Sequence, residues 1–301
     1  MAMKKKLVRK VKIKAHAKIN LYLDITGKRV DGYHNIHSLM QSILLADELV
    51  VSDAEDLKLI VSGEFKVPLE DNLVLKAAQT LQNFTKKKSG ACISLNKKIP
   101  VAAGLGGGSA DAAATLVGLN ILWDLKLSLK DLQAIGEKIG ADVPFCLQGG
   151  LCLVEGKGEK VSSLPGNFAA DIVIVKPSFE LSTSQVYSDF DKIRLPCVLF
   201  SMEPMIAALH KGSLRGVSSL LANVLEKPVI SKNPIIREIK EKALQAGATG
   251  ALMSGSGSSV FAIADSKEAA LKIANHLKGF YENVIVTATS QKGIDVYQEL
   301  I

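Results

Sequence analysis

Residues 100–111 are the segment that most constrains this chain, since they read Pro-Val-Ala-Ala-Gly-Leu-Gly-Gly-Gly-Ser-Ala-Asp. Four of the five positions from Gly104 to Gly108 are glycine, and an apolar, alanine-rich stretch follows as far as Leu122. Glycines remove the Cβ atoms that would keep a ligand away from the backbone. The free amides and the dipole at the start of a helix favour an anion. The segment therefore predicts a loop that leads from a strand into a helix and binds a phosphate group.

Two common phosphate-binding motifs do not fit this loop. A Walker A loop needs Lys-Ser or Lys-Thr after its last glycine, and a G-x-G-x-x-G motif needs a glycine where Ser109 stands. A tight turn without a ligand is the alternative interpretation, but four glycines after a proline favour anion binding. The hydroxyl of Ser109 can bond a phosphate or a metal-bound water.

The pattern of apolar side chains predicts the elements around this loop. Residues 11–23 alternate strictly between apolar and polar, which predicts a half-buried strand with Lys18 and Asn20 on its polar face. Cap and breaker signals predict one helix from Ser128 to Gly140 and another from Asn233-Pro234 to Gly247. We expect further helices over residues 72–84, 109–122, 184–190, 205–210, 217–221 and 267–277, and further strands over residues 49–51, 57–61, 91–95, 151–154, 171–175, 250–253, 260–264 and 284–289.

The order of these elements places the chain in the α+β class. Its 301 residues exceed what one hydrophobic core usually serves, so we expect two domains. The turn-rich residues 156–166 separate them, which gives domains at residues 1–165 and 166–301. In the second domain, a strand, helices, two strands, a helix and a strand predict an antiparallel sheet covered by helices.

The charge of the chain is concentrated at one end. The formal net charge is +7, and residues 1–14 carry +7, so the remainder sums to 7 − 7 = 0. The basic residues concerned are Lys4, Lys5, Lys6, Arg9, Lys10, Lys12 and Lys14. We interpret this excess as a solvated end and expect no nucleic-acid partner.

Several other classes of protein are disfavoured. No apolar run approaches the ~18 residues that span a bilayer, and the basic N-terminus lacks the apolar region of a secretory signal. We therefore expect a cytoplasmic protein without a membrane partner. The four cysteines, Cys92, Cys146, Cys152 and Cys197, form no CxxC pair and are expected to be reduced. Cysteines and histidines also lack the spacing of a zinc site.

Three further segments carry polar groups that each allow two interpretations. Asp142 can accept a hydroxyl proton, although its spacing favours a helix cap. Lys18 can steady an anion, although beside Lys12 and Lys14 it fits a solvated strand face. Residues 254–258, Ser-Gly-Ser-Gly-Ser, are equally compatible with a plain hairpin turn and with a second anion-binding nest.

Taken together, these segments resemble a known family. Residues 100–114 resemble the second signature of the galactokinase, homoserine, mevalonate and phosphomevalonate (GHMP) kinase superfamily, and residues 254–257 resemble its third. Residues 15–21, 26–34, 140–145 and 247–257 resemble the branch that acts on 4-diphosphocytidyl-2-C-methyl-D-erythritol. The Asp-Gly-Tyr-His run that ends at His34 is specific to that branch. The resemblance is weak over residues 192–203 and does not reach the basic residues before Val11.

The resemblance implies a fold and a reaction. The fold is a two-domain α+β kinase, with an ATP-binding N-terminal domain like ribosomal protein S5, a ferredoxin-like C-terminal α/β sandwich and the site between them. The reaction transfers a phosphoryl group from ATP, with Mg²⁺, to the 2-hydroxyl of 4-diphosphocytidyl-2-C-methyl-D-erythritol in the non-mevalonate isoprenoid route. The implied partner is this small molecule, bound by a monomer or homodimer.

The resemblance also assigns residues. Asp142 and Lys18 match the catalytic aspartate and its lysine, against the interpretations that spacing alone favours. The implied nucleotide positions are Asn72, Lys97, Pro100, Val101, Ala102, Ala103, Gly104, Leu105, Gly106, Gly107, Gly108, Ser109 and Ala110, and Ser109 also contacts Mg²⁺ indirectly. The implied substrate positions are Asn20, Tyr33, His34, Thr183, Tyr187, Gly255, Ser256 and Gly257. Cytosine is expected between the Tyr33-His34 segment and Tyr187.

Two alternatives remain open. A kinase of the mevalonate or homoserine type would share the glycine loop, but its substrate has no base to stack on Tyr33, His34 or Tyr187. A catalytically inactive regulator that only binds a ligand would need neither Lys18 nor Asp142, and both are present.

Overall fold

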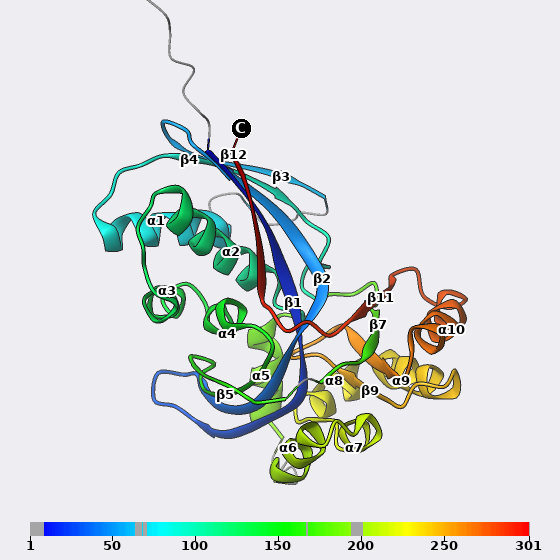
Figure 1. The fold of residues 1–301 in the computed structure, drawn as a ribbon. Coiled ribbons are helices and arrows are strands. Elements are labelled where there is room, and N and C mark those ends of the chain that lie inside the picture. The colour runs from blue at the N-terminus through cyan, green and yellow to red at the C-terminus, as the bar shows by residue number, and fades with distance from the viewer. Residues whose placement is uncertain (1–8, 64–67, 69–70, 167, 194–200, 301) are drawn as a thin grey trace, which may run out of the picture.

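A computed structural model describes residues 9–63, 68, 71–166, 168–193 and 201–300 of this chain. Two β-sheets, each packed against helices, organise the described residues (Figure 1). This arrangement is the α+β architecture that the sequence predicts.

The large sheet is built on a long antiparallel ribbon of β1 (Arg9–Lys28) and β2 (His34–Ser52). Within the described ranges its strand order is β12-β1-β2-β4-β3, and β5 and β8 pair with β2 and β1 beyond this path. The remaining strands are β3 (Leu57–Ser62), β4 (Ala91–Asn96), β5 (Leu151–Gly156), β6 (Lys160–Ser163), β8 (Ala222–Asn223) and β12 (Ile294–Leu300).

Irregularities in the β1–β2 ribbon fall where the site will be. The register shifts between His16 and Lys18 and again between Asn20 and Tyr22. Such bulges bend a strand and re-aim its side chains. The alternation that predicts a half-buried strand therefore holds near Lys12 and Lys14, which are exposed, but fails further along, where both faces of β1 are buried.

Four helices cover one face of this sheet: α1 (Leu73–Thr85), α2 (Gly107–Leu122), α3 (Leu129–Gly136) and α4 (Val143–Gln148) (Figure 1). Asn72 caps α1 by accepting from the Val74 amide at 2.9 Å, and Ser128 caps α3 in a reciprocal capping box. The prediction that this helix continues to Gly140 is wrong. It ends at Gly136, and turns follow in which the Ile139 amide donates to the Gly136 carbonyl oxygen at 2.9 Å.

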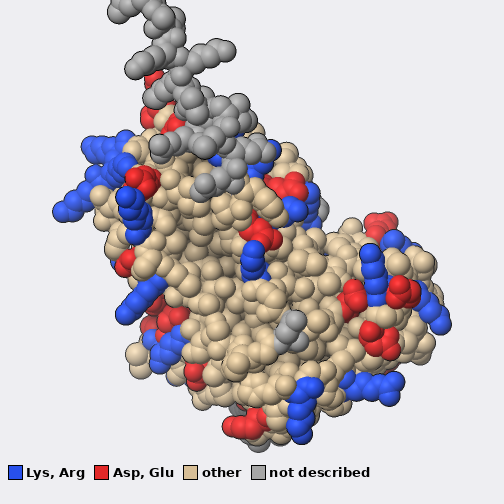
Figure 2. Space-filling view, viewed as in Figure 1, with Lys and Arg blue, Asp and Glu red and all other residues tan. Residues whose placement is uncertain are grey.

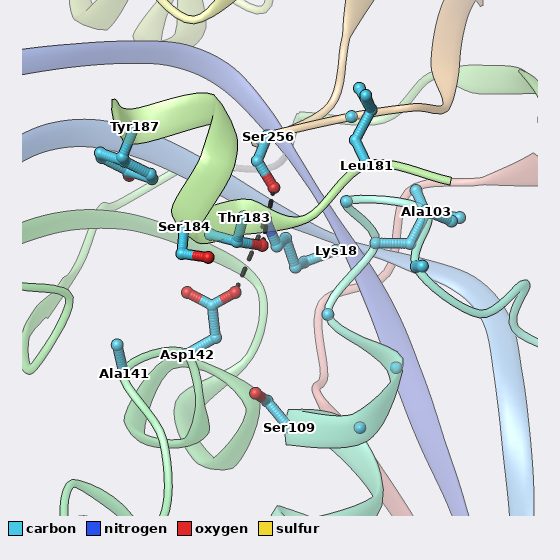
Figure 3. Close-up of a pocket in the computed structure, with 18 of the residues that line it drawn as sticks. Lys18, Ala103, Ser109, Ala141, Asp142, Leu181, Thr183, Ser184, Tyr187 and Ser256 are labelled. Atoms are coloured by element: carbon cyan, nitrogen blue, oxygen red, sulfur yellow. Dashed lines mark hydrogen bonds and ion pairs between the residues drawn. The ribbon is translucent and has the colours of Figure 1, made fainter. Parts of the chain in front are cut away.

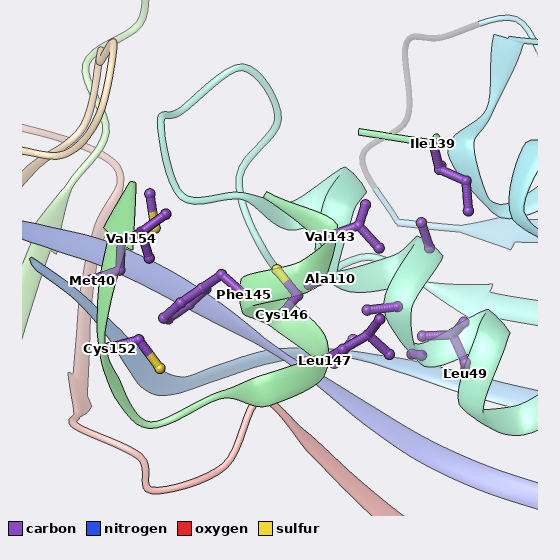
Figure 4. Close-up of a cluster of buried hydrophobic side chains, with 14 of the residues drawn as sticks. Met40, Leu49, Ala110, Ile139, Val143, Phe145, Cys146, Leu147, Cys152 and Val154 are labelled. Carbon is purple, nitrogen blue, oxygen red and sulfur yellow. The ribbon is translucent and has the colours of Figure 1, made fainter. Parts of the chain in front are cut away.

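The core of this half lies between α4, α2 and the ribbon. Figure 4 shows Phe145, between Met40 and Val154 on one side and the small Ala110 of α2 on the other. Phe145 is 1% exposed, so its loss would leave a large cavity, at a cost of about 3–5 kcal/mol. This packing fixes α4 and, with it, the residue just before the helix, Asp142.

The second half contains a smaller antiparallel sheet in the order β11-β7-β10-β9. Its strands are β7 (Asp171–Val175), β9 (Gly250–Met253), β10 (Val260–Ala264) and β11 (Val284–Ala288). Its helices are α5 (Thr183–Asp191), α6 (Glu203–His210), α7 (Leu214–Ser219), α8 (Glu226–Lys232), α9 (Ile235–Gln245) and α10 (Lys267–Lys278). The predicted antiparallel sheet is confirmed. Asn233 follows α8 as its C-cap, so the prediction that it caps α9 is wrong.

The two halves share strands. β8 pairs in parallel with β1, and β12 runs antiparallel along β1 with Leu300 opposite Arg9. The boundary between residues 165 and 166 stays a prediction, but two segments from beyond it complete the first sheet. Neither segment was predicted from the sequence, because β8 has only two residues and β12 alternates weakly.

On the face that Figure 2 draws, most of the surface belongs to residues that are neither basic nor acidic, and basic and acidic side chains are scattered among them. Among the described helices, none has the length and apolar character that a bilayer crossing requires. Cys146 and Cys152 are buried free thiols and Cys92 is half-buried, whereas Cys197 lies outside the described residues.

Candidate functional site

A cavity of about 1140 Å³ lies where the glycine loop, the β1–β2 ribbon, α5 and the β9–β10 loop meet. Typical small-molecule sites occupy about 300–1,000 Å³, so this one has room for two ligands of moderate size. The segments that line it come from both halves of the chain, and most of them are segments that the sequence singles out.

The glycine loop leads directly into α2. Gly106 occupies the N-cap position with φ of 71°, and the amides of Gly107, Gly108 and Ser109 begin the helix. The first amides of any α-helix lack an acceptor within the helix, and the positive end of the α2 dipole lies at the same place. A left-handed φ at Gly106 is costly for any other residue. The backbone at this end of the cavity therefore has the geometry that suits an anion, and anion binding by it stays a prediction.

A second loop, residues 254–259 between β9 and β10, packs on the first. Ser254 Oγ donates to the Gly104 carbonyl oxygen at 2.9 Å, and the Ser259 amide donates to Ala103 at 3.2 Å. A Cβ at Gly104 would lie 2.1 Å from the Ser254 carbonyl oxygen, so glycine is required there by the contact itself. The hairpin interpretation of this loop is confirmed, and anion binding by it stays a prediction.

Asn223 of β8 holds this second loop in place. This residue was not predicted from the sequence. Its amide nitrogen donates to the carbonyl oxygens of Met253 at 2.9 Å and Gly255 at 2.8 Å. Asn223 is buried, so its amide is fixed by these bonds. A two-residue strand has no periodic signal that could have pointed to it.

Lys18 passes between the two loops. Its stem lies 3.0 Å from where a Gly106 Cβ would be, and its ammonium lies 3.0 Å from where a Gly255 Cβ would be. Lys18 is 4% exposed, and its Nζ donates to Asn20 Oδ1 at 2.8 Å. The interpretation of Lys18 as part of a solvated face is wrong, because the glycine loop covers this part of β1.

The carboxylate of Asp142 faces Lys18, with 3.7 Å between Oδ2 and Nζ (Figure 3). Asp142 stands at the N-cap position of α4, but its side chain makes no capping hydrogen bond. The cap interpretation is therefore wrong for the side chain. Its carboxylate is 30% exposed and opens onto the cavity. A paired carboxylate with access to a ligand is the arrangement expected of a group that accepts or orients a proton.

A chain of buried hydrogen bonds holds the lysine of this pair in place. Asn20 Nδ2 donates to Ser38 Oγ at 2.9 Å, and Ser38 Oγ donates to the Tyr22 carbonyl oxygen at 2.7 Å. All three groups are buried, so Asn20 can present only its oxygen to Lys18. The lysine is thereby held toward Asp142.

Lys97 is bound by two buried carboxylates. Its ammonium pairs with Asp47, and with Asp111 of α2 at 2.7 Å. Although burial disfavours a charged lysine, the two carboxylates raise the pKa of Lys97. Burial raises the pKa of the Asp111 carboxyl well above its usual value, while Lys97 opposes this and Asp47 adds to it. Through Lys97, this cluster links Asp111 at the start of α2 to Asp47 of β2. It lies next to the glycine loop, since Lys97 Nζ is 3.3 Å from where a Gly107 Cβ would be.

The other end of the cavity is aromatic. The His34 and Tyr187 rings lie 5.0 Å apart between centroids, with 34° between their planes. Tyr33 is 58% exposed, and Lys157 Nζ lies 5.9 Å from its ring centroid. Burial raises the pKa of Tyr187, with a smaller contribution from Asp142, so its phenol stays neutral. Figure 3 shows Tyr187 and Ala103 on opposite sides of the Lys18–Asp142 pair.

Nearly all predicted site residues line this one cavity. Asn72 and Lys97 do so, as do residues 100–109 and the substrate positions Asn20, Tyr33, His34, Thr183, Tyr187, Gly255, Ser256 and Gly257. Thr183 and Ser256, from distant segments, have their hydroxyl oxygens 3.0 Å apart. Ala110 is the exception, since it is buried within α2 and faces the core shown in Figure 4.

An ion pair at the aromatic end, between Asp191 and Lys28, was not predicted from the sequence. Asp191 lies at the end of α5 and Lys28 at the end of β1, and both line the cavity. A signal existed for each. Asp191 follows Tyr187 by four positions, which places both on one helix face, and Lys28 lies in the segment that includes Tyr33.

Comparison with known proteins agrees with this geometry. The GHMP kinases N terminal domain matches residues 72–150, and the GHMP kinases C terminal domain matches residues 205–283. The fold is shared with a homoserine kinase from Cytophaga hutchinsonii, with a TM-score of 0.74 at 24% identity over 99% of both chains. Fold and site thus define a GHMP-type kinase.

Closer relatives narrow this class. The 4-diphosphocytidyl-2-C-methyl-D-erythritol kinase of Thermoanaerobacter pseudethanolicus is 41% identical over 97% of this chain and 100% of its own length. The enzyme of the same name from Listeria innocua is 43% identical over 91% of this chain and 94% of its own. A crystal structure of 4-(cytidine 5'-diphospho)-2C-methyl-D-erythritol kinase superposes with a TM-score of 0.79, at 32% identity, over 93% of this chain and 99% of that one. The chain belongs to the 4-diphosphocytidyl-2-C-methyl-D-erythritol kinase family.

Proposed function

We propose that this chain phosphorylates the 2-hydroxyl of 4-diphosphocytidyl-2-C-methyl-D-erythritol with ATP, giving the 2-phosphate and ADP. The observation that carries the proposal is the Lys18–Asp142 pair, 3.7 Å apart, between an anion-binding glycine loop and an aromatic pocket. Membership of the family supports the choice of substrate. The step belongs to isoprenoid precursor synthesis by the non-mevalonate route.

The glycine loop is suited to hold the phosphates of ATP. Its backbone amides point to one end of the cavity, and a Cβ at Gly106 would come within 3.0 Å of the Lys18 stem. Within the described residues, no group of three acidic, histidine or cysteine side chains could hold a metal ion alone. Mg²⁺ would therefore arrive with the nucleotide, as is usual for this ion, and Ser109 is the hydroxyl placed to contact its bound water. Bound Mg²⁺ would neutralise charge on the phosphates.

Asp142 and Lys18 would act on the acceptor hydroxyl. Asp142 Oδ2 would accept a hydrogen bond from the 2-hydroxyl, orient its oxygen for in-line attack and take its proton as the new P–O bond forms and the bond from the γ-phosphorus to the departing ADP oxygen breaks. Asn20 and the two loops enclose Lys18, so its charge would be held in place to stabilise the negative charge that develops on the transferred phosphoryl group. Preorganised charges of this kind need no rearrangement during the reaction.

The aromatic end would hold the cytidylyl group. Stacking of a base on Tyr187 or Tyr33 contributes about 0.5–1.5 kcal/mol beyond the burial of the rings. His34 is buried beside Tyr187, so it would border the edge of the base. A substrate without a base would leave this end of the cavity unfilled, which argues against mevalonate or homoserine as the acceptor.

The experiment measures ADP release with Mg-ATP and 4-diphosphocytidyl-2-C-methyl-D-erythritol, beside mevalonate and homoserine as controls. Turnover with the cytidylyl substrate alone is expected. Turnover with a control instead would support the assignment as a kinase and contradict the cytosine pocket. No ADP release with any of the three acceptors would favour the regulator that only binds a ligand.

A cytoplasmic location, a monomeric or homodimeric state and the absence of a nucleic-acid partner complete the proposal.

A further inference from the structure

The carboxylate of Asp191, at the aromatic end of the cavity, has no part in the proposed phosphoryl transfer. Asp191, the last residue of α5, accepts hydrogen bonds from His34 Nε2 at 2.7 Å and from Lys28 Nζ at 2.6 Å. The His34 side chain is 7% exposed, whereas that of Asp191 is 28% exposed. The carboxylate thus reaches from the second half of the chain to the β1–β2 ribbon of the first.

The charge of Asp191 fixes the direction of its bond to His34. The hydrogen bond from Lys28 holds the pKa of Asp191 below its usual value, against the effect of burial and together with His34. An ionised carboxylate can only accept, so the imidazole must donate from Nε2. In a neutral ring with its proton on Nε2, Nδ1 is an acceptor. No group within the described ranges is bonded to Nδ1, so this acceptor is available to a ligand.

The same helix turn carries the stacking ring. Tyr187 precedes Asp191 by four positions in α5, so the two side chains lie on one face. His34 contacts both, by a hydrogen bond to Asp191 and by ring packing against Tyr187. The orientation of the Nδ1 acceptor is therefore coupled to the surface on which a base would stack.

We propose that Asp191 is a positioning residue that makes the site select cytosine over uracil, by holding His34 with Nδ1 as an acceptor toward the exocyclic amine. This inference rests on the proposed function. Cytosine carries an amino donor at the position where uracil carries a carbonyl oxygen. Against uracil, two acceptors would face each other in a buried site, and each would lose its bond to water. Sites that recognise a donor by a fixed acceptor reject an analogue without that donor.

A purely structural role for Asp191 makes a different prediction. The contacts to Lys28 and His34 also join the two halves of the chain, so their loss would loosen the pocket. A looser pocket would weaken binding of both bases by the same factor. The ratio of the two affinities therefore separates selection from anchoring.

The test compares wild-type protein with Asp191→Ala and Asp191→Asn by calorimetric titration with CDP and with UDP, alongside ADP release with the cytidylyl substrate. An asparagine amide can donate to Nε2 as well as accept from it, so Asp191→Asn admits both tautomers of the ring. Asp189→Asn is the matched control. Asp189 lies on the same helix and also pairs with two lysines, Lys192 and Lys232, but it does not line the cavity.

The wild-type protein and Asp189→Asn are expected to bind CDP at least about tenfold more tightly than UDP, the factor that one hydrogen bond supplies. Both Asp191 variants should reduce that preference to within about threefold and raise KM for the cytidylyl substrate more than KM for ATP. A wild-type ratio retained in both Asp191 variants, with ADP still formed, overturns the inference. An absence of ADP formation by the wild-type protein overturns the proposed function and this inference with it.

Discussion

The two ends of the cavity are built in different ways. The end formed by the glycine loop, proposed above to hold phosphates and called the phosphate end, consists of backbone: glycines, helix amides and carbonyl oxygens, with one loop packed on another. The aromatic end, proposed to hold the cytosine and called the base end, consists of side chains from distant segments, with His34 and Lys28 from the ribbon and Tyr187 and Asp191 from α5. A backbone site recognises any phosphate, whereas a side-chain site can be changed one residue at a time. The difference teaches that the reaction and the choice of substrate can vary separately in this fold.

The largest effect is expected between the two ends, at Asp142. Asp142→Asn keeps the size of the side chain but removes the group that accepts the proton, so kcat should fall by about 10²–10⁴-fold. Neither end of the cavity is altered, so the Kd for ATP should stay within about twofold of wild type. Single-turnover kinetics and equilibrium titration measure the two quantities. An undiminished kcat would remove Asp142 from the mechanism.

A substitution at the phosphate end should damage the fold as well as the activity. Gly104→Ala would place a Cβ 2.1 Å from the Ser254 carbonyl oxygen, at a φ of 72°. The strain should lower the free energy of unfolding by about 1–3 kcal/mol and loosen the contact between the two loops, with KM for ATP raised. Gly27→Ala, where a Cβ would meet nothing within 4 Å, is the control. Equal effects of the two substitutions in denaturant titrations would contradict this account of the loops.

A substitution at the base end should affect only binding of the substrate. Tyr187→Ala removes a stacking surface and should weaken binding of the cytidylyl substrate by roughly 1–2 kcal/mol. The affinity for ATP should change little, because the glycine loop lies on the other side of the Lys18–Asp142 pair. Calorimetric titration with each ligand checks both expectations. An unchanged Kd for the cytidylyl substrate would exclude Tyr187 from the site.

The smallest effect is expected in acid, at Asp189, which lies on α5 outside the cavity. Hydrogen bonds from Lys232 and then Lys192 hold the pKa of Asp189 at about 2, below its usual 3.8. A lowered folded-state pKa stabilises the protein above pH 3.8, and this stabilisation is lost as the pH falls towards about 2. Wild type should therefore melt slightly higher than Asp189→Asn at neutral pH, and the difference should shrink in acid. A difference that grows on acidification would reverse the sign and contradict this prediction.

The same contrast explains what could be predicted from the sequence. The phosphate end is one contiguous segment, and the requirement for glycine at 104 and 106 is visible in the letters themselves. Residues alone gave the wrong interpretation of Lys18, because an alternating strand does not reveal that a loop some 85 positions later covers it. Only the family resemblance corrected this. The spacing of Asp191 from Tyr187 placed it on the same helix face, but its contacts with Lys28 and His34 could not be predicted, because both partners are distant in the chain.

The fold was predicted best where signals are local. Capped helices such as α1 and the antiparallel sheet of the second half follow from residues close in sequence. Helix ends such as Gly136, after which turns replace the last predicted helical turn, were displaced by a few residues. The full length of β2 was missed, because buried polar residues such as Gln41 and Asp47 interrupt its apolar pattern. These polar groups are bonded to distant backbone or to Lys97.

The return of β12 to β1 has a consequence for how this protein can be divided. The last strand in the chain is the neighbour of the first, so the large sheet closes only after the whole polypeptide has been made. A gene fragment that stops at residue 165 would encode a sheet whose first strand has an open edge, and open edges promote aggregation. The start of β1 and the end of β12 lie side by side in this sheet, with Arg9 opposite Leu300. A short linker there would allow the chain to be reopened elsewhere, and each such permutant would report whether the two halves of the chain can be synthesised in either order.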